Sequence, residues 1–538
     1  MGIYINPGSG KFQMSKRAKI YVDKSELIEK LNPLVETEDR FVCVSRPRRF
    51  GKTMAANMLA AYYGCGEDTH QLFEDLKIAK TVSYRMHLNQ HMVLQLNIQN
   101  FLSENPSVES MLKDIQKEVI AELKEYYPAE SGDSESLPRV MEKIYAATGQ
   151  TFIILIDEWD CLFREYKNSA EAQKMYLDFL RNWLKDRAYV GLAYMTGILP
   201  IKKYGSHSAL NMFNEFTMTG YDELAPYFGF TETEVQTLCS LYEMNFEEAK
   251  VWYDGYLLDL GNVEDKPENR VSMYSPKSVV EAMKRHSFGT YWNQTETYEA
   301  LQNYIKMNFE GLKDDVVIML AGGNVKININ KFANDMTNLN SKDDVFTLLI
   351  HLGYLTYDKK TETVKIPNKE VTCEYLNVLE DSSQWGNVVK AIENSRNLLL
   401  DLWNREEKKV ALGIDLAHQE VSILQYNDEN ALSYTIQLAF YYAREYYSII
   451  RELPTGKGYA DLCFIPRKRH LDKPALLIEL KWDKNVRAAI DQIKEKKYQG
   501  ALQEYRSNLL LVGINYDRKS KKHECVIERF NSLNDEGD

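Results

Sequence analysis

The segment Ser45-Arg46-Pro47-Arg48-Arg49-Phe50-Gly51-Lys52-Thr53 decides the fold of the N-terminal half of this chain. An apolar run at 41–44 precedes it, and small and apolar residues that favour a helix follow it at 54–61. A strand, a tight loop that ends in Gly-Lys-Thr and a helix are the context of a phosphate-binding P-loop. Backbone N–H groups and the aligned peptide dipoles at a helix start attract an anionic phosphate. We therefore expect Lys52 to contact the β- and γ-phosphates of a nucleotide and the Thr53 hydroxyl to ligate Mg²⁺.

One position of this loop departs from the P-loop pattern. The glycine expected five residues before Gly51 is Arg46, and two more arginines, Arg48 and Arg49, follow. A basic loop exposed to solvent in front of a helix is the alternative interpretation. The arginines themselves have two open roles, because they either add positive charge beside the phosphates or brace the segments that cover the nucleotide.

Polar side chains follow the strongest buried-strand signal in the chain. Residues 151–156 are largely β-branched and apolar, which indicates a strand covered on both faces of a parallel sheet, and Asp157 and Glu158 come directly after them. We expect Asp157 to hold the Mg²⁺ shell and Glu158 to orient or deprotonate the attacking water. The alternative is that both residues only cap the following helix.

Two further strands are predicted at 91–98 and 190–195, and Thr196 follows the second. Strands that alternate with helices predict a parallel α/β sheet whose ligand site lies at the carboxyl ends of the strands. Thr196 is therefore expected to contact the γ-phosphate or the attacking water. The P-loop, the acidic pair and Thr196 all fall at such strand ends.

The composition limits the class of protein. A length of 538 residues predicts about two to four domains. No apolar run approaches the ~20 residues that span a bilayer, and the N-terminus lacks the features of a signal peptide. Seven cysteines without a Cys-x-x-Cys pair favour a reduced, cytoplasmic protein without membrane association. The net charge of −12 argues against a generally basic surface but leaves room for a local basic groove.

The middle of the chain carries weaker signals. Residues 220–290 are helical and aromatic in pattern, which predicts a lid packed on the sheet or a small domain of its own. A helix at 343–352 followed by two strand-like segments predicts a winged-helix-like unit. That helix is acidic and apolar and has no arginine to offer to a DNA groove, so we expect a structural or interdomain role.

A second chemical site is predicted near the C-terminus. Residues 459–465 and 475–482 form two strand-like runs, and in a hairpin centred near His470 Asp461 lies opposite Glu479. Side chains alternate along a strand, so Glu479 and Lys481 share a face. Two close carboxylates repel unless a cation lies between them, and Mg²⁺ or Mn²⁺ suits such oxygen donors. Lys481 is then expected to orient or help deprotonate a metal-bound water for attack on a phosphodiester.

Neighbouring helices supply two more candidates for this site. A helix at 486–498 places Gln492 near the end of the hairpin, and Glu429 at the start of an earlier helix is a further carboxylate. The alternative is a surface hairpin with an ordinary cross-strand ion pair. Against that alternative, Asp461 and Glu479 stand within otherwise apolar strands.

Four segments between residues 20 and 290 resemble the bacterial AAA-ATPase-like family. They are Tyr21-Val22-Asp23-Lys24, Arg46-Pro47-Arg48-Arg49-Phe50-Gly51-Lys52-Thr53, Ile156-Asp157-Glu158 and Trp252-Tyr253-Asp254-Gly255-Tyr256. The Arg-Pro-Arg-Arg-Phe-Gly-Lys loop is usual in that family, so the resemblance makes Arg46 a family feature. Residues 400–530 resemble the PD-(D/E)XK nuclease superfamily. Asp461, Glu479 and Lys481 match its core and Gln492 its helical glutamine, while Ala460-Asp461 stands where Pro-Asp is frequent.

The resemblances imply an α/β protein with four parts: a P-loop ATPase core at 1–219, a helical lid at 220–290, a helical or winged-helix-like connector at 291–395 and a restriction-endonuclease-like domain at 396–538. ATP is the expected ligand, with Mg²⁺ on Thr53 and Asp157. The expected nucleotide contacts are Arg46, Arg48, Arg49, Phe50, Gly51, Lys52, Thr53, Met54, Asp157 and Thr196. The expected metal ligands of the second site are Glu429, Asp461 and Glu479.

The leading hypothesis is an ATP-regulated, metal-dependent nuclease that acts on nucleic acid, with DNA favoured over RNA, as a monomer or a homo-oligomer. The alternative is a nucleotide-dependent signalling switch whose nuclease fold only binds nucleic acid. A third hypothesis, an ATP-driven motor on DNA, has less support because the sequence identifies no arginine finger.

Overall fold

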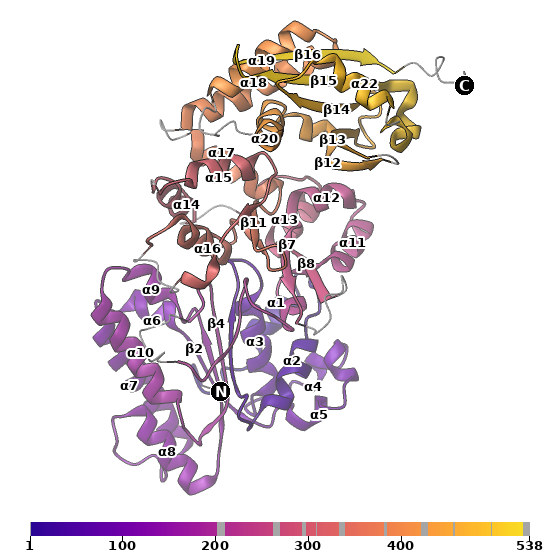
Figure 1. Cartoon of the computed structure of the whole chain (residues 1–538). Helices are drawn as coiled ribbons and strands as arrows, with labels where there is room; N and C mark the ends of the chain where they lie inside the picture. Colours follow the sequence, from indigo (N-terminus) through magenta and orange to yellow (C-terminus); the bar gives the residue numbers. More distant parts are fainter. Residues whose placement is uncertain are drawn as a thin grey trace. The chain divides into compact units, whose positions relative to one another are not determined.

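The computed structural model describes residues 2–201, 210–261, 269–292, 297–307, 309–332, 339–380, 385–420, 429–455, 458–495 and 498–530 (Figure 1). The chain divides into two compact units. Unit 1 comprises Met1–Tyr304 and Lys326–Cys373, and unit 2 comprises Ile305–Val325 and Glu374–Asp538. The connector predicted at 291–395 has residues in both units, and the boundaries of the four parts predicted from the sequence stay a prediction.

Unit 1 is built on a five-stranded sheet of order β2-β3-β4-β1-β5, in which every neighbouring pair is parallel. Its strands are β1 (Phe41–Ser45), β2 (Met92–Asn97), β3 (Phe152–Asp157), β4 (Val190–Gly197) and β5 (Asn214–Phe216). All residues of β1, β3 and β4 are buried, as expected for parallel strands that are covered on both faces. The three strands predicted at 91–98, 151–156 and 190–195 are thus confirmed, with ends that differ by one or two residues.

Helices flank this sheet, with α2 and α3 to one side of the strands and α7 and α10 to the other (Figure 1). The longest of them, α7, begins with a capping box in which Ser107 Oγ accepts the Ser110 N–H at 3.2 Å. Its buried residues recur at helical spacing, so one face packs against the core. The helices are α1 (Gly10–Lys16), α2 (Glu26–Leu31), α3 (Lys52–Tyr63), α4 (His70–Phe73), α5 (Tyr84–His87), α6 (Ile98–Glu104), α7 (Val108–Tyr126), α8 (Leu137–Thr148), α9 (Cys161–Glu165) and α10 (Ala170–Leu184).

The segment predicted to be a helical lid contains a small sheet as well as helices. An antiparallel sheet of order β6-β8-β7 packs with three helices around a core that includes Tyr253, Tyr274 and Val279. The elements are β6 (Phe230–Thr231), α11 (Glu232–Leu241), α12 (Phe246–Tyr253), β7 (Tyr256–Asp259), β8 (Arg270–Tyr274) and α13 (Pro276–Arg285). Strands of two to five residues are too short to show an alternating pattern, so the sequence did not predict this sheet.

The winged-helix-like pattern is present, but its helix has almost no exposed face. Helix α16 (Lys342–Leu352) is followed by an antiparallel pair of strands, β10 (Thr356–Asp358) and β11 (Thr363–Lys365). Every residue from Asp344 to Leu352 is buried. A buried helix cannot enter a DNA groove, which agrees with the expected structural role. The neighbouring elements are α14 (Thr297–Ile305), α15 (Leu312–Leu320), β9 (Val325–Lys326) and α17 (Lys369–Glu380).

Unit 2 holds a mixed five-stranded sheet of order β12-β13-β14-β15-β16, in which only β14 and β15 are parallel. Seven of the eight residues of the central strand β14 are buried. The strands are β12 (Tyr447–Thr455), β13 (Gly458–Pro466), β14 (Ala475–Trp482), β15 (Leu509–Asp517) and β16 (Lys522–Arg529). The hairpin predicted from 459–465 and 475–482 is confirmed.

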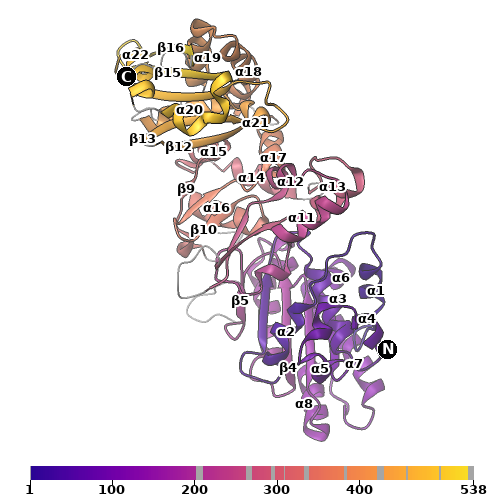
Figure 2. The same ribbon diagram turned by 90° about the vertical axis from the view of Figure 1, so that its right-hand side faces the viewer.

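Five helices accompany the sheet of unit 2, and both views place α18, α19 and α20 beside its strands (Figures 1 and 2). They are α18 (Gly386–Trp403), α19 (Glu407–Glu420), α20 (Glu429–Ala439), α21 (Ala443–Tyr446) and α22 (Arg487–Glu495). Helix α22 packs on β14 and β15 through Ile490 and Ile493. In the described residues of the whole chain, no helix is both long and apolar enough to cross a bilayer.

Candidate functional sites

The P-loop joins β1 to α3 through a backbone that needs glycine at its end. Gly51 is the N-cap of α3 and has a φ of 91°, and Arg49 has a φ of 70°. A left-handed conformation costs a non-glycine residue about 1–2 kcal/mol, whereas glycine adopts it freely. The sequence therefore places glycine where the chain turns into the helix, and the free N–H groups of the first turn of α3 can receive an anion.

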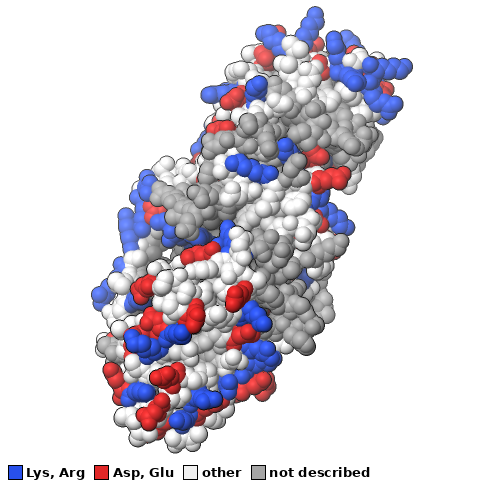
Figure 3. Space-filling view, turned by 90° about the vertical axis from the view of Figure 1, so that its left-hand side faces the viewer, with Lys and Arg blue, Asp and Glu red and all other residues white. Residues whose placement is uncertain are grey.

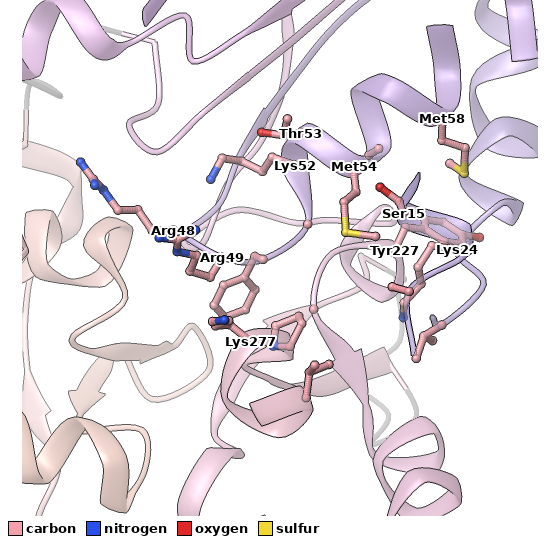
Figure 4. Close-up of a pocket in the computed structure, with 18 of the residues that line it drawn as sticks. Ser15, Lys24, Arg48, Arg49, Lys52, Thr53, Met54, Met58, Tyr227 and Lys277 are labelled. Atoms are coloured by element: carbon pink, nitrogen blue, oxygen red, sulfur yellow. The ribbon is translucent and has the colours of Figure 1, made fainter. Parts of the chain in front are cut away.

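A cavity of about 870 Å³ opens beside this first turn. This volume lies within the range of about 300–1,000 Å³ that is usual for small-molecule sites. Figure 4 shows Lys52 and Thr53 on the first turn of α3 and Lys277 of α13 on the far side of the loop. Residues of the predicted nucleotide site that line the cavity are Arg48, Arg49, Phe50, Gly51, Lys52, Thr53, Met54 and Glu158.

Lys52 is held against its own loop. Its Nζ donates to the carbonyl oxygens of Arg46 and Pro47, both at 3.0 Å, and the residue is 5% exposed. Burial lowers the pKa of Lys52, while the nearby carboxylates of Glu158, Asp160 and Asp157 oppose that shift. The ammonium group thus lies at the cavity wall among acidic neighbours, in a place from which it can reach a phosphate.

Asp157 and Thr196 meet at the carboxyl ends of adjacent strands. Asp157 Oδ1 accepts from Thr196 Oγ1 at 2.5 Å and from the Glu158 N–H at 3.1 Å, and Oδ2 accepts from Asn97 Nδ2 at 3.4 Å. Asp157 is 2% exposed and Thr196 is fully buried. The strand order brings these residues together, since β3 lies between β2 and β4. Asn97 was not among the residues predicted for the site, although its position at the end of β2 marks it as a neighbour of Asp157.

Glu158 lines the cavity in an ion pair that the sequence did not predict. Its Oε2 lies 2.5 Å from Arg164 Nη2 of α9, and Arg164 Nε lies 3.5 Å from Asp160 Oδ2. Burial and the charge of Asp160 raise the pKa of Glu158, and the cations of Lys52 and Arg164 partly oppose this. Glu158 also has a φ of 53°, in the left-handed region. Arg164 lines the cavity as well, so a cation stands beside the predicted catalytic carboxylate.

Arg46, an expected nucleotide contact, is not among the residues that line the cavity. Arg46 is fully buried, pairs with Asp222 and donates from Nη1 to the Phe216 carbonyl at 3.2 Å. Its guanidinium lies 5.5 Å from the centre of the Phe228 ring. The side chain therefore points into the protein and away from the cavity. Of the two roles considered for the arginines, the geometry of Arg46 agrees with bracing.

The candidate site of unit 2 forms where β13, β14 and α22 meet. The ladder between β13 and β14 ends with the pair of Leu462 and Ile478, and Asp461 and Glu479 stand directly beyond it on the two strands. Asp461 Oδ2 accepts the Leu480 N–H at 2.7 Å, which fixes the orientation of this carboxylate. Glu479 Oε1 accepts from Lys481 Nζ at 3.0 Å and also from Gln492 Nε2. The predicted residues Asp461, Glu479, Lys481 and Gln492 thus lie together.

The carboxylate oxygens of this site suit a hard divalent cation, although they are few. Glu479 and Lys481 are 2% and 7% exposed, and a carboxylate pair on neighbouring strands provides the oxygen ligands that Mg²⁺ or Mn²⁺ takes. Across the described ranges, no cluster of three or more His, Cys, Asp or Glu side chains suited to a metal is found. Glu429, the third predicted ligand, begins α20, but its side chain lies outside the described residues.

Two family models match the chain. Residues 10–206 match a family described as predicted AAA-ATPase, and residues 428–525 match the PD-(D/E)XK nuclease superfamily. The chain joins an AAA-ATPase-like module to a PD-(D/E)XK module. The first match includes Lys52, Thr53 and Glu158, and the second includes Asp461, Glu479, Lys481 and Gln492. Part of the cavity wall, including Tyr227 and Lys277, lies beyond residue 206.

An uncharacterized protein from the vnfD 5′ region of Azotobacter chroococcum mcd 1 is 26% identical to this chain over 293 residues. The match covers 52% of this chain and 51% of the relative, so the chain spans about half the length of that protein.

Solved structures similar to this chain are distant from it. The Walker-type ATPase PABY2304 of Pyrococcus abyssi has 13% identity and a TM-score of 0.32, over 65% of this chain and 94% of that one. The ORC2 protein of Aeropyrum pernix, solved as ADPNP–ADP complexes, has 11% identity and a TM-score of 0.27, over 69% and 93%. The ORC1 protein of Aeropyrum pernix, in complex with DNA, has 11% identity and a TM-score of 0.24, over 67% and 93%. Likeness of this degree supports no inference about the activity of the two modules.

Proposed function

We propose that the protein binds and hydrolyses ATP in the AAA-ATPase-like module and cleaves nucleic acid phosphodiesters in the PD-(D/E)XK module, with the first activity controlling the second. The observation that carries the ATP assignment is the cavity at the start of α3, which is lined by Lys52, Thr53 and Glu158 together. The cleavage assignment rests on the cluster of Asp461, Glu479, Lys481 and Gln492 in a matched nuclease region.

In the ATPase-like site, the residues divide the work of phosphoryl transfer. The N–H groups at the start of α3 and the ammonium of Lys52 bind the β- and γ-phosphates. The Thr53 hydroxyl and Asp157 would hold Mg²⁺, which would offset the charge that develops on the phosphates. Glu158 orients the attacking water and takes its proton once Arg164 no longer holds its carboxylate.

In the PD-(D/E)XK site, Asp461 and Glu479 would hold a divalent ion, which would lower the pKa of a bound water and polarise the phosphodiester. The Leu480 N–H keeps the Asp461 carboxylate in place. Gln492 of α22 keeps the Glu479 carboxylate in place by donating a hydrogen bond to it. Lys481 donates a hydrogen bond to Glu479 in this structure. In the proposed mechanism it would orient the water that attacks the phosphodiester.

Titration calorimetry with ATP and Mg²⁺ tests the nucleotide site. Lys52→Ala is expected to abolish detectable ATP binding, because the remaining contacts lack the cation that faces the phosphates. Glu158→Gln is expected to keep the affinity and to lower the turnover about 100-fold or more, since general-base catalysis contributes about 10²–10⁴-fold. ATP binding that is equal in Lys52→Ala and the natural protein contradicts the assignment.

Incubation of the full chain with DNA or RNA, with Mg²⁺ or Mn²⁺ and with or without ATP, tests the cleavage site. Lys481→Ala is expected to lose cleavage. Asp461→Asn keeps an oxygen that can accept the Leu480 N–H but loses the charge, so it should fold normally and fail to bind Mn²⁺ in calorimetry. Cleavage of no substrate by the natural protein, or equal cleavage by Lys481→Ala, rejects the nuclease assignment.

A second candidate function is a nucleotide-dependent switch in which the PD-(D/E)XK module only binds nucleic acid. The observation that favours it is the engagement of Glu479 Oε1 by both Lys481 and Gln492, which places two donors on an oxygen that a metal would need. Nucleic acid binding without Mn²⁺ binding, and without cleavage, supports this function over the first.

A further inference from the structure

A turn rich in lysine and arginine joins β15 to β16 in unit 2. We call Arg518, Lys519, Lys521 and Lys522 the basic turn, and all four residues are exposed. Within the ranges that the structure describes, Lys519, Lys521 and Lys522 form no ion pair with a carboxylate. The chain as a whole has a net charge of −12, so this concentration of cations is not a general property of its surface.

The basic turn lies at the end of the sheet that carries Lys481. Strand β15 runs parallel to β14, and the register places Lys481 beside Asn515. Arg518 follows Asn515 by three residues, so it lies about 10 Å farther along the strand direction at ~3.3 Å per residue. This is the distance of about three nucleotides along one strand of a duplex, which carries a phosphate every ~3.4 Å of its axis.

Hydrogen bonds from backbone N–H groups connect the end of β15 and the basic turn to the loop that follows Lys481. The Asp483 N–H donates to the Tyr516 carbonyl at 2.9 Å, and the Lys484 N–H donates to Asn515 Oδ1 at 3.0 Å. The Arg518 N–H donates to Asp483 Oδ1 at 2.6 Å. The turn and the loop are therefore one structural piece, and a substrate held by the turn is held at a fixed distance from Lys481.

A second basic turn in the same unit lacks this placement. Residues 467–473 join β13 to β14, and Lys481 follows Ala475, the first residue of β14, by six residues. That turn is thus about 20 Å from Lys481 at ~3.3 Å per residue. Its Lys473 also pairs with Asp472 at 3.0 Å.

Lys and Arg side chains also gather along the upper margin of unit 2 in Figure 3, whereas both signs of charge mix over the lower part of that view.

We propose that the basic turn binds the phosphate backbone of duplex DNA and directs it to the PD-(D/E)XK site, an inference that rests on the proposed function. Lysines on a turn offer point charges to phosphates and no paired donors to base edges, so the contact positions the duplex without reading its sequence. Through this contact, a chain of negative net charge would bind DNA by one local surface.

The test is the salt dependence of DNA binding by the full chain in EDTA, where no cleavage occurs, measured by fluorescence anisotropy with a labelled duplex DNA. The variant Lys519→Gln/Lys521→Gln/Lys522→Gln removes three exposed cations and should fold normally. Each lost phosphate contact lowers the slope of log K against log salt by about 0.9, so a decrease of about 2 to 3 is expected. The matched control is Lys113→Gln/Lys117→Gln/Lys124→Gln on α7, three exposed lysines of unit 1, which should leave the slope unchanged.

An unchanged slope in the basic-turn variant, an equal decrease in the control, or no DNA binding by the natural chain overturns the inference. The proposed function fails separately, in the cleavage assay with Mg²⁺ or Mn²⁺. Cleavage by the natural chain together with an unchanged slope rejects the basic turn and keeps the nuclease. A turn-dependent slope without any cleavage keeps the basic turn and rejects the nuclease.

Discussion

The carboxylate of Glu158 has charged neighbours of opposite effect, and their balance sets its protonation. Burial and Asp160 raise its pKa above the ordinary 4.5, and Lys52 and Arg164 lower it. A general base acts only when it is deprotonated. In the proposed role of Glu158, the raised pKa would therefore place the acidic limb of ATP hydrolysis at a higher pH than an exposed glutamate would. Arg164, at 2.5 Å, is the cation in direct contact with the carboxylate.

Replacing Arg164 with glutamine should therefore move the acidic limb of the ATPase pH profile to higher pH. The substitution removes a charge that favours ionised Glu158, so the pKa of Glu158 rises further and less of the base is available at a given acidic pH. The measurement is the rate of phosphate release across the pH range at saturating ATP. Lys277→Gln, which removes an exposed cation that lines the same cavity, should leave the limb in place. A limb that shifts to lower pH in Arg164→Gln contradicts the assigned role of Glu158.

At the scale of elements, residues that follow the parallel sheet brace the P-loop. Phe50 packs edge-on against Tyr256 of β7 with ring centres 5.0 Å apart, and its carbonyl accepts the Gly229 N–H at 3.1 Å. Gly229 has a φ of 95°, and a Cβ there would lie 3.2 Å from the Phe50 ring, so glycine is needed at this approach. The buried pair of Arg46 and Asp222 adds a charged contact between the loop and the same segment.

Breaking that buried pair from one side should destabilise unit 1 strongly. Arg46→Ala leaves Asp222 without its partner, and removal of one member of a buried ion pair typically costs about 3–5 kcal/mol. Burial already raises the pKa of Asp222 and Arg46 opposes this, so the variant should become more sensitive to rising pH as the orphaned carboxylate ionises. Thermal unfolding is the measurement, with Arg46→Ala/Asp222→Ala as the control.

The double variant should unfold at a higher temperature than Arg46→Ala, because it leaves no buried charge unpaired. An Arg46→Ala protein that is as stable as the natural one contradicts the brace. ATP affinity that falls in the folded double variant, with its cavity residues intact, would restore a phosphate role for Arg46.

How far the sequence predicts these elements depends on the range of the interactions that form them. The parallel strands were predictable because long apolar runs followed by polar residues are local signals, as at Ile156 and Asp157. The proximity of Asp461 and Glu479 was predictable because two apolar runs on either side of one turn indicate a hairpin, whose pairing brings these positions together. The ion pair of Arg46 with Asp222 was not, since it joins distant parts of the chain. The ion pair of Glu158 with Arg164 was not, since it depends on how the chain turns between β3 and α9.

At the scale of the whole molecule, the two sites belong to different compact units of one chain. The Lys52 cavity lies in unit 1, and Glu479 and Lys481 lie in unit 2. Control of one site by the other requires that ATP favour one state of the second site over another, and ATP that binds both states equally shifts nothing. Nucleotide control therefore requires that the rate of cleavage differ with and without ATP, which the presence of two separate sites does not by itself imply.

Nucleotide control predicts that the rate of DNA cleavage differs with and without ATP, and that two variants separate binding from hydrolysis. Lys52→Ala should cleave at the ATP-free rate whether or not ATP is present, because it does not bind the nucleotide. Glu158→Gln should bind ATP without hydrolysing it, so in the presence of ATP it should keep cleaving at the rate of the ATP-bound state. The measurement is single-turnover cleavage of a labelled duplex in Mg²⁺, with Lys481→Ala as the background. Rates that ATP leaves unchanged in the natural chain, with ATP binding confirmed by calorimetry in the same buffer, would show two independent enzymes joined in one polypeptide.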